Sequence, residues 1–181
     1  MLSDEQLVEA ALAGEAGAFG QLVDRYQDRL LRFLVTRAQS RADAEDATQD
    51  TFLAAYRYLS SFNPRWRFST WLYRIALRNL ARIAPSTGGT ADAEPVEHRD
   101  PLAACIVASQ RENIWLSAKR ELAPDAFDAL WLRYAEEMPV KEVARALDRS
   151  NSWVKVTLMR SRQKLKQTLT EPAAAGSKSY G

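Results

Sequence analysis

Arginine and aromatic residues alternate between Thr51 and Ala91, a span that contains no acidic residue. A guanidinium group binds phosphate, and the face of an aromatic ring stacks on an unpaired base. These residue types in one span predict a surface for single-stranded nucleic acid. The arginines are Arg57, Arg65, Arg67, Arg74, Arg78 and Arg82, and the aromatic residues are Phe52, Tyr56, Tyr58, Phe62, Trp66, Phe68, Trp71 and Tyr73.

The segment from Ser60 to Arg67 is the part of this span where a binding loop is expected. Serine, asparagine and proline interrupt a helix there, yet the segment carries two large rings, Phe62 and Trp66, and two arginines, Arg65 and Arg67. We therefore interpret it as a ligand-binding loop. A small helical domain also needs large side chains in its core, and we expect Phe52, Tyr56 and Trp71 to fill it.

An acidic block precedes this span. The residues from Asp43 to Asp50 include four acids and no base. They cannot face the same polyanion, so they predict a second, basic partner. The alternative is that the acids simply stabilise the positive end of a helix dipole.

A second informative pattern lies near the end of the chain. We expect a short helix from Val140 to Leu147, a turn over residues 148–150, and a longer helix that Ser150 or Asn151 caps and that continues to about Leu169. Two helices joined in this way form a helix-turn-helix. The segment 149–169 contains six bases and no acid, which suits a helix in the major groove; the alternative is a basic solvated helix. Its buried side is predicted to carry Val154, Leu158 and Leu165.

The rest of the sequence predicts an all-α protein with two small helical domains. Ser3 and Gln6 form an expected capping box, and further helices are predicted over residues 19–36, 42–58, 102–122 and 124–134. Ser69 or Thr70 is expected to cap a helix that ends near Ile83. Phe127, Leu130, Trp131 and Tyr134 form the predicted buried stripe of their helix. The expected boundaries are a domain over 1–84, an acidic linker over 85–110, a second domain over 111–170, and a disordered tail over 171–181.

Composition excludes several other classes. No apolar run is long enough to span a membrane and the start lacks a signal-peptide pattern, so a cytoplasmic protein is expected. The single cysteine, Cys105, excludes a disulfide framework. The single histidine, His98, has no clustered ligand types around it, so we expect no metal, no cofactor and no enzymatic site.

The segments DAEDATQDTF, FSTWLYRIALRN and LAPDAFDALWLRYAEEMPVKEVARALDRSNSWVKVTLMRSRQKL together resemble bacterial sigma factors of the extracytoplasmic-function (ECF) group, over about residues 5–169. The resemblance implies a subunit that binds core RNA polymerase, through its beta and beta-prime subunits, and directs it to promoters. Its first domain would melt the minus-ten element, and its second would read the minus-thirty-five element as duplex DNA. Composition alone predicts a solvated tether for the linker, whereas the resemblance implies that it threads through the polymerase. An anti-sigma partner is also implied.

The resemblance assigns roles by position. Residues that would bind core polymerase are Asp43, Glu45, Asp46, Gln49 and Asp50. Residues that would contact the minus-ten DNA are Phe62, Asn63, Arg65, Trp66, Arg67, Arg74, Arg78 and Asn79. Residues that would read or flank the minus-thirty-five element are Ser150, Asn151, Ser152, Trp153, Lys155, Thr157 and Arg160.

The chain departs from the family pattern at four places. The usual acid and arginine run after Asn79 is missing, so phosphate contacts there should be weaker. Asp148 replaces a turn glycine, Ser152-Trp153 replaces Gly-Thr, and Val156-Thr157 replaces Ser-Arg. The bulky Trp153 suggests an unusual upstream sequence or a weaker reliance on that element. The alternative function is a helix-turn-helix regulator that binds duplex DNA without polymerase.

Overall fold

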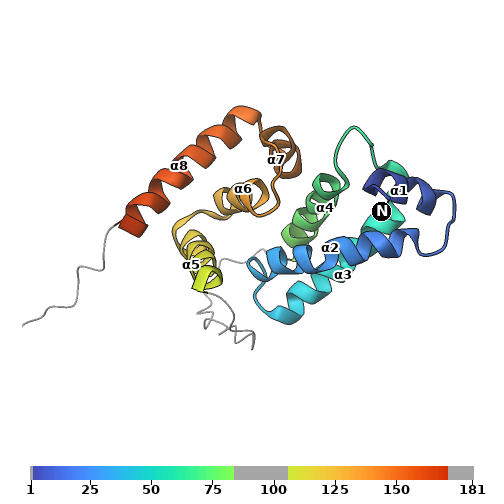
Figure 1. Cartoon of the computed structure of the whole chain (residues 1–181), viewed down its shortest axis with the longest axis horizontal. Helices are drawn as coiled ribbons and strands as arrows, with labels where there is room; N and C mark the ends of the chain where they lie inside the picture. The colour runs from blue at the N-terminus through green and yellow to red at the C-terminus, as the bar shows by residue number, and fades with distance from the viewer. Residues whose placement is uncertain (1, 84–105, 171–181) are drawn as a thin grey trace, which may run out of the picture.

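The computed structural model describes residues 2–83 and 106–170, and the regular elements in this part of the chain are all helical (Figure 1). The expected all-α class is therefore confirmed. The first group of helices consists of α1 (Asp4–Leu12), α2 (Ala18–Val35), α3 (Arg41–Arg57), the 3-10 turn η1 (Leu59–Ser61) and α4 (Phe68–Ile83). The second consists of α5 (Ile106–Glu121), α6 (Pro124–Tyr134), α7 (Val140–Leu147) and α8 (Asn151–Thr170).

Two expectations about the middle and the end of the chain lie mostly outside the described residues. These are the linker, with His98 and Cys105, and the tail over 171–181. The described part shows that α5 begins at Ile106, inside the segment 85–110 that was predicted to be linker. None of the helices within residues 2–83 and 106–170 is both long and apolar enough to cross a membrane.

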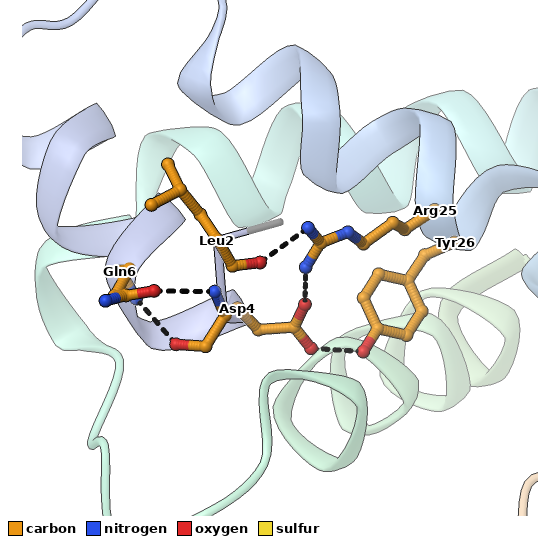
Figure 2. A network of polar contacts seen from close by, with 6 residues as sticks. Leu2, Asp4, Gln6, Arg25 and Tyr26 are labelled. Atoms are coloured by element: carbon orange, nitrogen blue, oxygen red, sulfur yellow. Dashed lines mark hydrogen bonds and ion pairs between the residues drawn. The ribbon is translucent and has the colours of Figure 1, made fainter.

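The helix α1 is fixed by polar contacts at its start. The predicted capping box is present, with the Ser3 hydroxyl accepting from the Gln6 amide and the Gln6 side chain accepting from the Ser3 amide. The next residue, Asp4, accepts from Arg25 at 2.7 Å and from the Tyr26 hydroxyl (Figure 2). Burial and the neighbouring Asp4 raise the pKa of the Tyr26 phenol. This network attaches α1 to α2, where Leu7 and Val8 enter the core.

The first core forms where α2, α3 and α4 meet. Leu22, Leu30 and Phe33 of α2 recur at helical spacing and are buried, as the periodicity predicts. Phe52 of α3 is buried too, but the expectation for Tyr56 is wrong, because 63% of that residue is exposed. Its ring packs edge-on against Phe19 at the surface, at a centroid distance of 5.1 Å.

The helix α4 begins earlier than expected. It starts at Phe68, so Ser69 and Thr70 lie inside its first turn and do not cap it. Both side chains are buried, and the Thr70 hydroxyl donates to Glu142 of α7. The prediction failed because this hydroxyl bonds to a residue far along the chain.

The second group has an aromatic core and the predicted helix-turn-helix. Trp115 packs against Phe127 and Trp131 at 6.1 and 4.8 Å, whereas Tyr134 is 46% exposed and does not complete the stripe. The bounds of α7 agree with the sequence prediction. Asp148 ends α7 in the left-handed conformation at φ 56°, and the Ser150 hydroxyl accepts from the Trp153 amide at 3.1 Å, which caps α8.

The two groups pack against each other. The helix α4 contacts α7, and the ring of Phe33 on α2 meets Trp131 on α6 at 6.1 Å. Met138, between α6 and α7, is fully buried and lies against Thr70. The two predicted groups of helices therefore share an interface.

Candidate nucleic-acid and polymerase interfaces

The loop from Phe62 to Arg67 places its two rings differently. Phe62 is half-buried and packs against Phe68 and Trp71 at 5.9 and 5.7 Å, so it anchors the loop to α4. The Asn63 side chain accepts from the Arg65 amide at 3.0 Å, and its carbonyl accepts from the Trp66 amide at 3.1 Å. These bonds form a turn that carries Trp66 away from the aromatic cluster.

Trp66 lies among positive charges. Lys141 is 5.2 Å from the ring centroid, and the Arg145 guanidinium is 4.4 Å from it, both from α7. Arg65 and Arg67 on the loop itself are exposed. Such a ring can stack on a base while the surrounding cations bind phosphate.

The helix α4 continues this positive surface. Arg74 is half-buried and pairs with Asp148 at 3.4 Å, Arg78 is exposed, and Asn79 is half-buried. Arg74 and Arg78 line an open cavity of about 730 Å³, together with Arg37 and with residues of α6 and α7. Four aspartates, Asp43, Asp125, Asp128 and Asp148, line the same cavity, so Arg74 and Arg78 form the positive side of a cavity of mixed charge.

The five residues predicted to bind polymerase are all exposed on α3. Asp43 lies in the first turn of α3 and closes a capping box with Ser40, as the helix-dipole alternative expects, and Glu45 forms an ion pair with Arg41 at 2.8 Å, so both acids have a local role. Asp46 and Asp50 are one turn apart and have no such local role in the described structure. Leu53, which follows on the same stripe, is 64% exposed and was missed. The signal was an apolar residue on the charged side of an amphipathic helix.

The recognition-helix candidates lie along the first half of α8. Ser150, Asn151 and Ser152 are exposed at its start, followed by the exposed Lys155 and Arg160 and the half-buried Thr157. Trp153 is half-buried beneath the Arg149 guanidinium, 5.2 Å from its ring, and Arg149 also pairs with Asp125 at 2.6 Å. Val156 and Met159 are 40% and 45% exposed on this helix, and the sequence analysis missed them.

Two buried ionisable side chains, Asp128 and Tyr73, have a raised pKa. Burial raises the pKa of Asp128 to about 7 and outweighs the opposing effect of Arg37, whose Nε is 3.1 Å from the carboxylate. Burial raises the pKa of the Tyr73 phenol, and the negative charge of Glu136 raises it further. Within the described residues, no group of three histidine, cysteine or acidic side chains is placed to hold a metal ion.

Known families match both halves of the chain. Residues 22–83 match Sigma-70 region 2, and residues 113–165 match Sigma-70 region 4. The fold and the order of these regions define the class of the protein, a promoter-recognising sigma subunit of RNA polymerase.

Relatives that match along most of this chain identify the group of sigma factors to which it belongs. The chain is 35% identical to the ECF RNA polymerase sigma factor BldN of Streptomyces coelicolor over 178 residues, which cover 93% of this chain and 66% of BldN. It is 31% identical to the ECF RNA polymerase sigma-E factor of Haemophilus influenzae over 182 residues, 93% of this chain and 96% of that protein. The chain belongs to the ECF RNA polymerase sigma factors.

Solved structures agree with this assignment. A structure of CnrH in complex with the cytosolic domain of CnrY is similar to this chain with a TM-score of 0.69 and 26% identity, covering 92% of this chain and 96% of CnrH. The sigma factor RpoE of Bartonella quintana, solved with the anti-sigma factor NepR, has the same fold, with a TM-score of 0.67 at 20% identity, covering 85% of this chain and 98% of that chain.

Proposed function

We propose that this sigma factor divides promoter recognition between residues 1–84 and 111–170, with the segment 85–110 as the connection through polymerase. The observation that most directly supports two roles for the first domain is that its exposed acids and its arginines lie on different helices, with Asp43 alone reaching the cavity lined by Arg74 and Arg78. Exposed acids and Leu53 lie on α3, whereas Trp66 and the arginines lie on α4 and the loop before it. One domain can therefore bind a protein and a nucleic acid at the same time.

The acidic surface is the proposed docking site for core polymerase. Asp46 and Asp50 supply charge, and Leu53 supplies an apolar anchor between them and the end of α3. Charged groups around an exposed apolar side chain are typical of a protein interface.

The arginine surface is the proposed site of strand separation. Trp66 would stack on a base that leaves the duplex, and Arg65, Arg67, Arg74 and Arg78 would bind the neighbouring phosphates. Binding a melted strand more tightly than duplex DNA offsets the cost of melting. Phe62 would hold the loop in position, because its ring already packs on α4.

The start of α8 is the proposed reader of the upstream element. Asn151, Ser152 and Lys155 are exposed in its first turns, where a recognition helix contacts base edges. Arg160 lies further along and would bind phosphate. The ring of Trp153 beneath Arg149 replaces smaller residues of the family pattern, so the preferred sequence should differ from that of relatives.

The remaining properties follow from this role. The protein would act in the cytoplasm without chemistry, metal or cofactor of its own. An anti-sigma protein is a further expected partner, since CnrH was solved with CnrY and the Bartonella protein with the anti-sigma factor NepR. It would cover the polymerase- and DNA-binding surfaces described above.

The test is transcription with purified sigma-free core polymerase on a library of promoter fragments from the host. We expect discrete start sites that depend on this protein. Stable binding to duplex DNA without polymerase, together with no binding to core polymerase, would instead establish the free-standing helix-turn-helix regulator.

A further inference from the structure

The exposed side of α8 carries an apolar pair at its centre. The buried side of this helix repeats at a spacing of four, three and four residues, through Val154, Leu158, Ser161 and Leu165. The residues two positions before each of these are all exposed and form an outward strip: Ser152, Val156, Met159 and Gln163. Since a helix completes a turn in about 3.6 residues, a shift of two residues leads to nearly the opposite side. Val156 and Met159 are therefore the middle of the outward strip.

Positive side chains border the outward strip on both sides. Lys155 and Arg160 are exposed, and the helical period places Val156 and Met159 between them around the helix axis. The segment 149–169 contains six bases and no acid, so the partner that complements this face is a polyanion. An apolar centre between two cations fits the major groove of a DNA duplex, where base edges lie between two phosphate backbones.

The apolar pair suits only one of the groups that base pairs present in the major groove. Adenine, guanine and cytosine present hydrogen-bond donors and acceptors there, whereas thymine adds a 5-methyl group. A valine side chain has no hydrogen-bonding atom, and a methionine sulfur is only a weak acceptor. Contact with a methyl group removes apolar surface from water, but contact with the amino group of cytosine would remove its water without supplying a hydrogen bond. Thymine is therefore the base that these side chains favour.

The spacing of the pair sets how far apart the contacted bases lie. Three residues of helix rise about 4.5 Å, and successive base pairs are about 3.4 Å apart, so Val156 and Met159 reach neighbouring base pairs. The branched side chain of Val156 has one strongly preferred rotamer in a helix, whereas Met159 has three rotatable bonds. The requirement for thymine should therefore be stricter at the base pair that Val156 contacts.

We propose that Val156 and Met159 are specificity-determining residues that select thymine at two neighbouring base pairs of the upstream element, through contact with the 5-methyl groups. The inference rests on the proposed function for the placement of α8 in the major groove, and it adds the chemical group that the outward strip reads. Asn151, Ser152 and Lys155 would supply polar contacts to the flanking base pairs.

Replacing thymine with uracil in the upstream element tests the inference, because uracil keeps the pairing groups and lacks only the methyl group. The promoter is one recovered from the library by transcription with this protein and core polymerase. Its DNA is rebuilt with deoxyuridine at each upstream thymine in turn, and the affinity of the holoenzyme is measured by competition with unmodified DNA. We expect about fourfold weaker binding at each of two neighbouring positions, the effect of one buried methyl group, and no change for uracil in the spacer between the promoter elements.

Matched variants connect this effect to the two side chains. With Val156→Ala and Met159→Ala together, the holoenzyme should bind the thymine and uracil promoters nearly equally. Leu116→Ala removes another exposed apolar side chain, on α5, and should keep the fourfold difference. The single variant Val156→Ala should lose the difference at one position only. It replaces the double variant if circular dichroism shows that the double variant does not fold.

Three results would overturn the inference. They are equal affinity of the wild-type holoenzyme for thymine and uracil DNA, an upstream element without thymine on either strand, and full sensitivity to uracil in the double alanine variant. Start sites that depend on this protein, with no effect of uracil, would refute only thymine selection and leave the proposed function intact. If no start sites appear with the wild-type protein, the proposed function fails and this inference fails with it.

Discussion

At the scale of single residues, Phe62 and Trp66 lie in one short loop but make different kinds of contact. Phe62 contacts two rings of the first domain, whereas Trp66 contacts only cations of the second domain among the aromatic and cation–π contacts described. The family resemblance predicts base capture for both rings. The contacts give Phe62 a structural role, and base capture by Trp66 stays a prediction.

Substituting the two rings separately tests this division. Phe62→Ala should lower the free energy of unfolding by about 1–2 kcal/mol, as expected for a half-buried ring, and Trp66→Ala should lower it less. Trp66→Ala should instead impair initiation on a duplex promoter and recover on a pre-melted bubble. Tyr58→Ala, at another exposed ring, is the control. Lack of recovery on the bubble would contradict base capture by Trp66.

Asp128 is expected to make folding stability depend on pH. Its pKa is about 7 in the folded chain, against about 3.9 in an unfolded one. Between these values the folded chain binds more protons, so the free energy of unfolding should fall as pH rises from about 4 to 7 and then level off. The charged groups facing it are Arg37 and Asp125, with Arg74 and Arg149 on the same cavity.

Urea unfolding at several pH values measures this dependence. Asp128→Asn removes the ionisable group while keeping its shape, so its stability should vary less across the same range. Asp24→Asn, an exposed acid, should behave as wild type. Equal slopes for Asp128→Asn and wild type would show that the dependence arises elsewhere.

At the scale of elements, the acids that stabilise α3 differ from the acids that it exposes to a partner. Ser40 and Asp43 cap the helix, so Asp46 and Asp50 remain available for a partner. Asp46→Lys with Asp50→Lys should abolish binding to core polymerase in a pull-down and leave the melting temperature nearly unchanged, because both side chains are exposed. Asp24→Lys with Asp28→Lys, on the exposed side of α2, is the matched control. Wild-type affinity in the α3 variant would refute the docking surface.

The α7–α8 turn depends on the left-handed backbone of Asp148. Aspartate tolerates this conformation and glycine adopts it freely, whereas alanine pays the steric cost without compensation. Asp148→Ala should therefore destabilise the second domain by about 1 kcal/mol, and Asp148→Gly should not. Both variants lose the pair with Arg74, so the difference between their thermal unfolding curves isolates the backbone effect. Similar curves would show that the turn is unstrained.

At the scale of the whole molecule, the shared interface should couple the unfolding of the two domains. Phe33, Trp131 and the buried Glu136 belong to contacts that disappear if either half unfolds. We expect one calorimetric transition for the wild-type chain, with agreement between calorimetric and van't Hoff enthalpies. Glu142→Lys with Asp148→Asn, which breaks two arginine–acid pairs between the domains, should split or broaden it. A control with Glu9→Lys and Asp24→Asn, at exposed sites of the first domain, should not. Two separate transitions in the wild type would mean that the interface contributes little.

Local sequence determined the helices of this protein and the turns between them. The bounds of α7, the capping box at Ser3 and the cap at Ser150 were predicted, because each depends on residues a few positions apart. Asp148 has the left-handed backbone of the turn glycine that it replaces in the family pattern. The two DNA- and polymerase-binding segments were recognisable for the same reason. Their residue types recur at fixed spacing within single helices and loops.

Tertiary structure decided which of these residues face each other. Tyr56 and Tyr134 have core-like spacing but are exposed, Phe62 turns inward, and Thr70 bonds to Glu142 instead of capping its own helix. Arginine–acid pairs between the domains join residues 74 to 107 positions apart, from Arg74–Asp148 to Arg29–Glu136. Helical periodicity fixes which side of a helix is apolar, but it does not fix which other helix covers that side. That choice depends on the shape and charge of surfaces that exist only after both domains have folded.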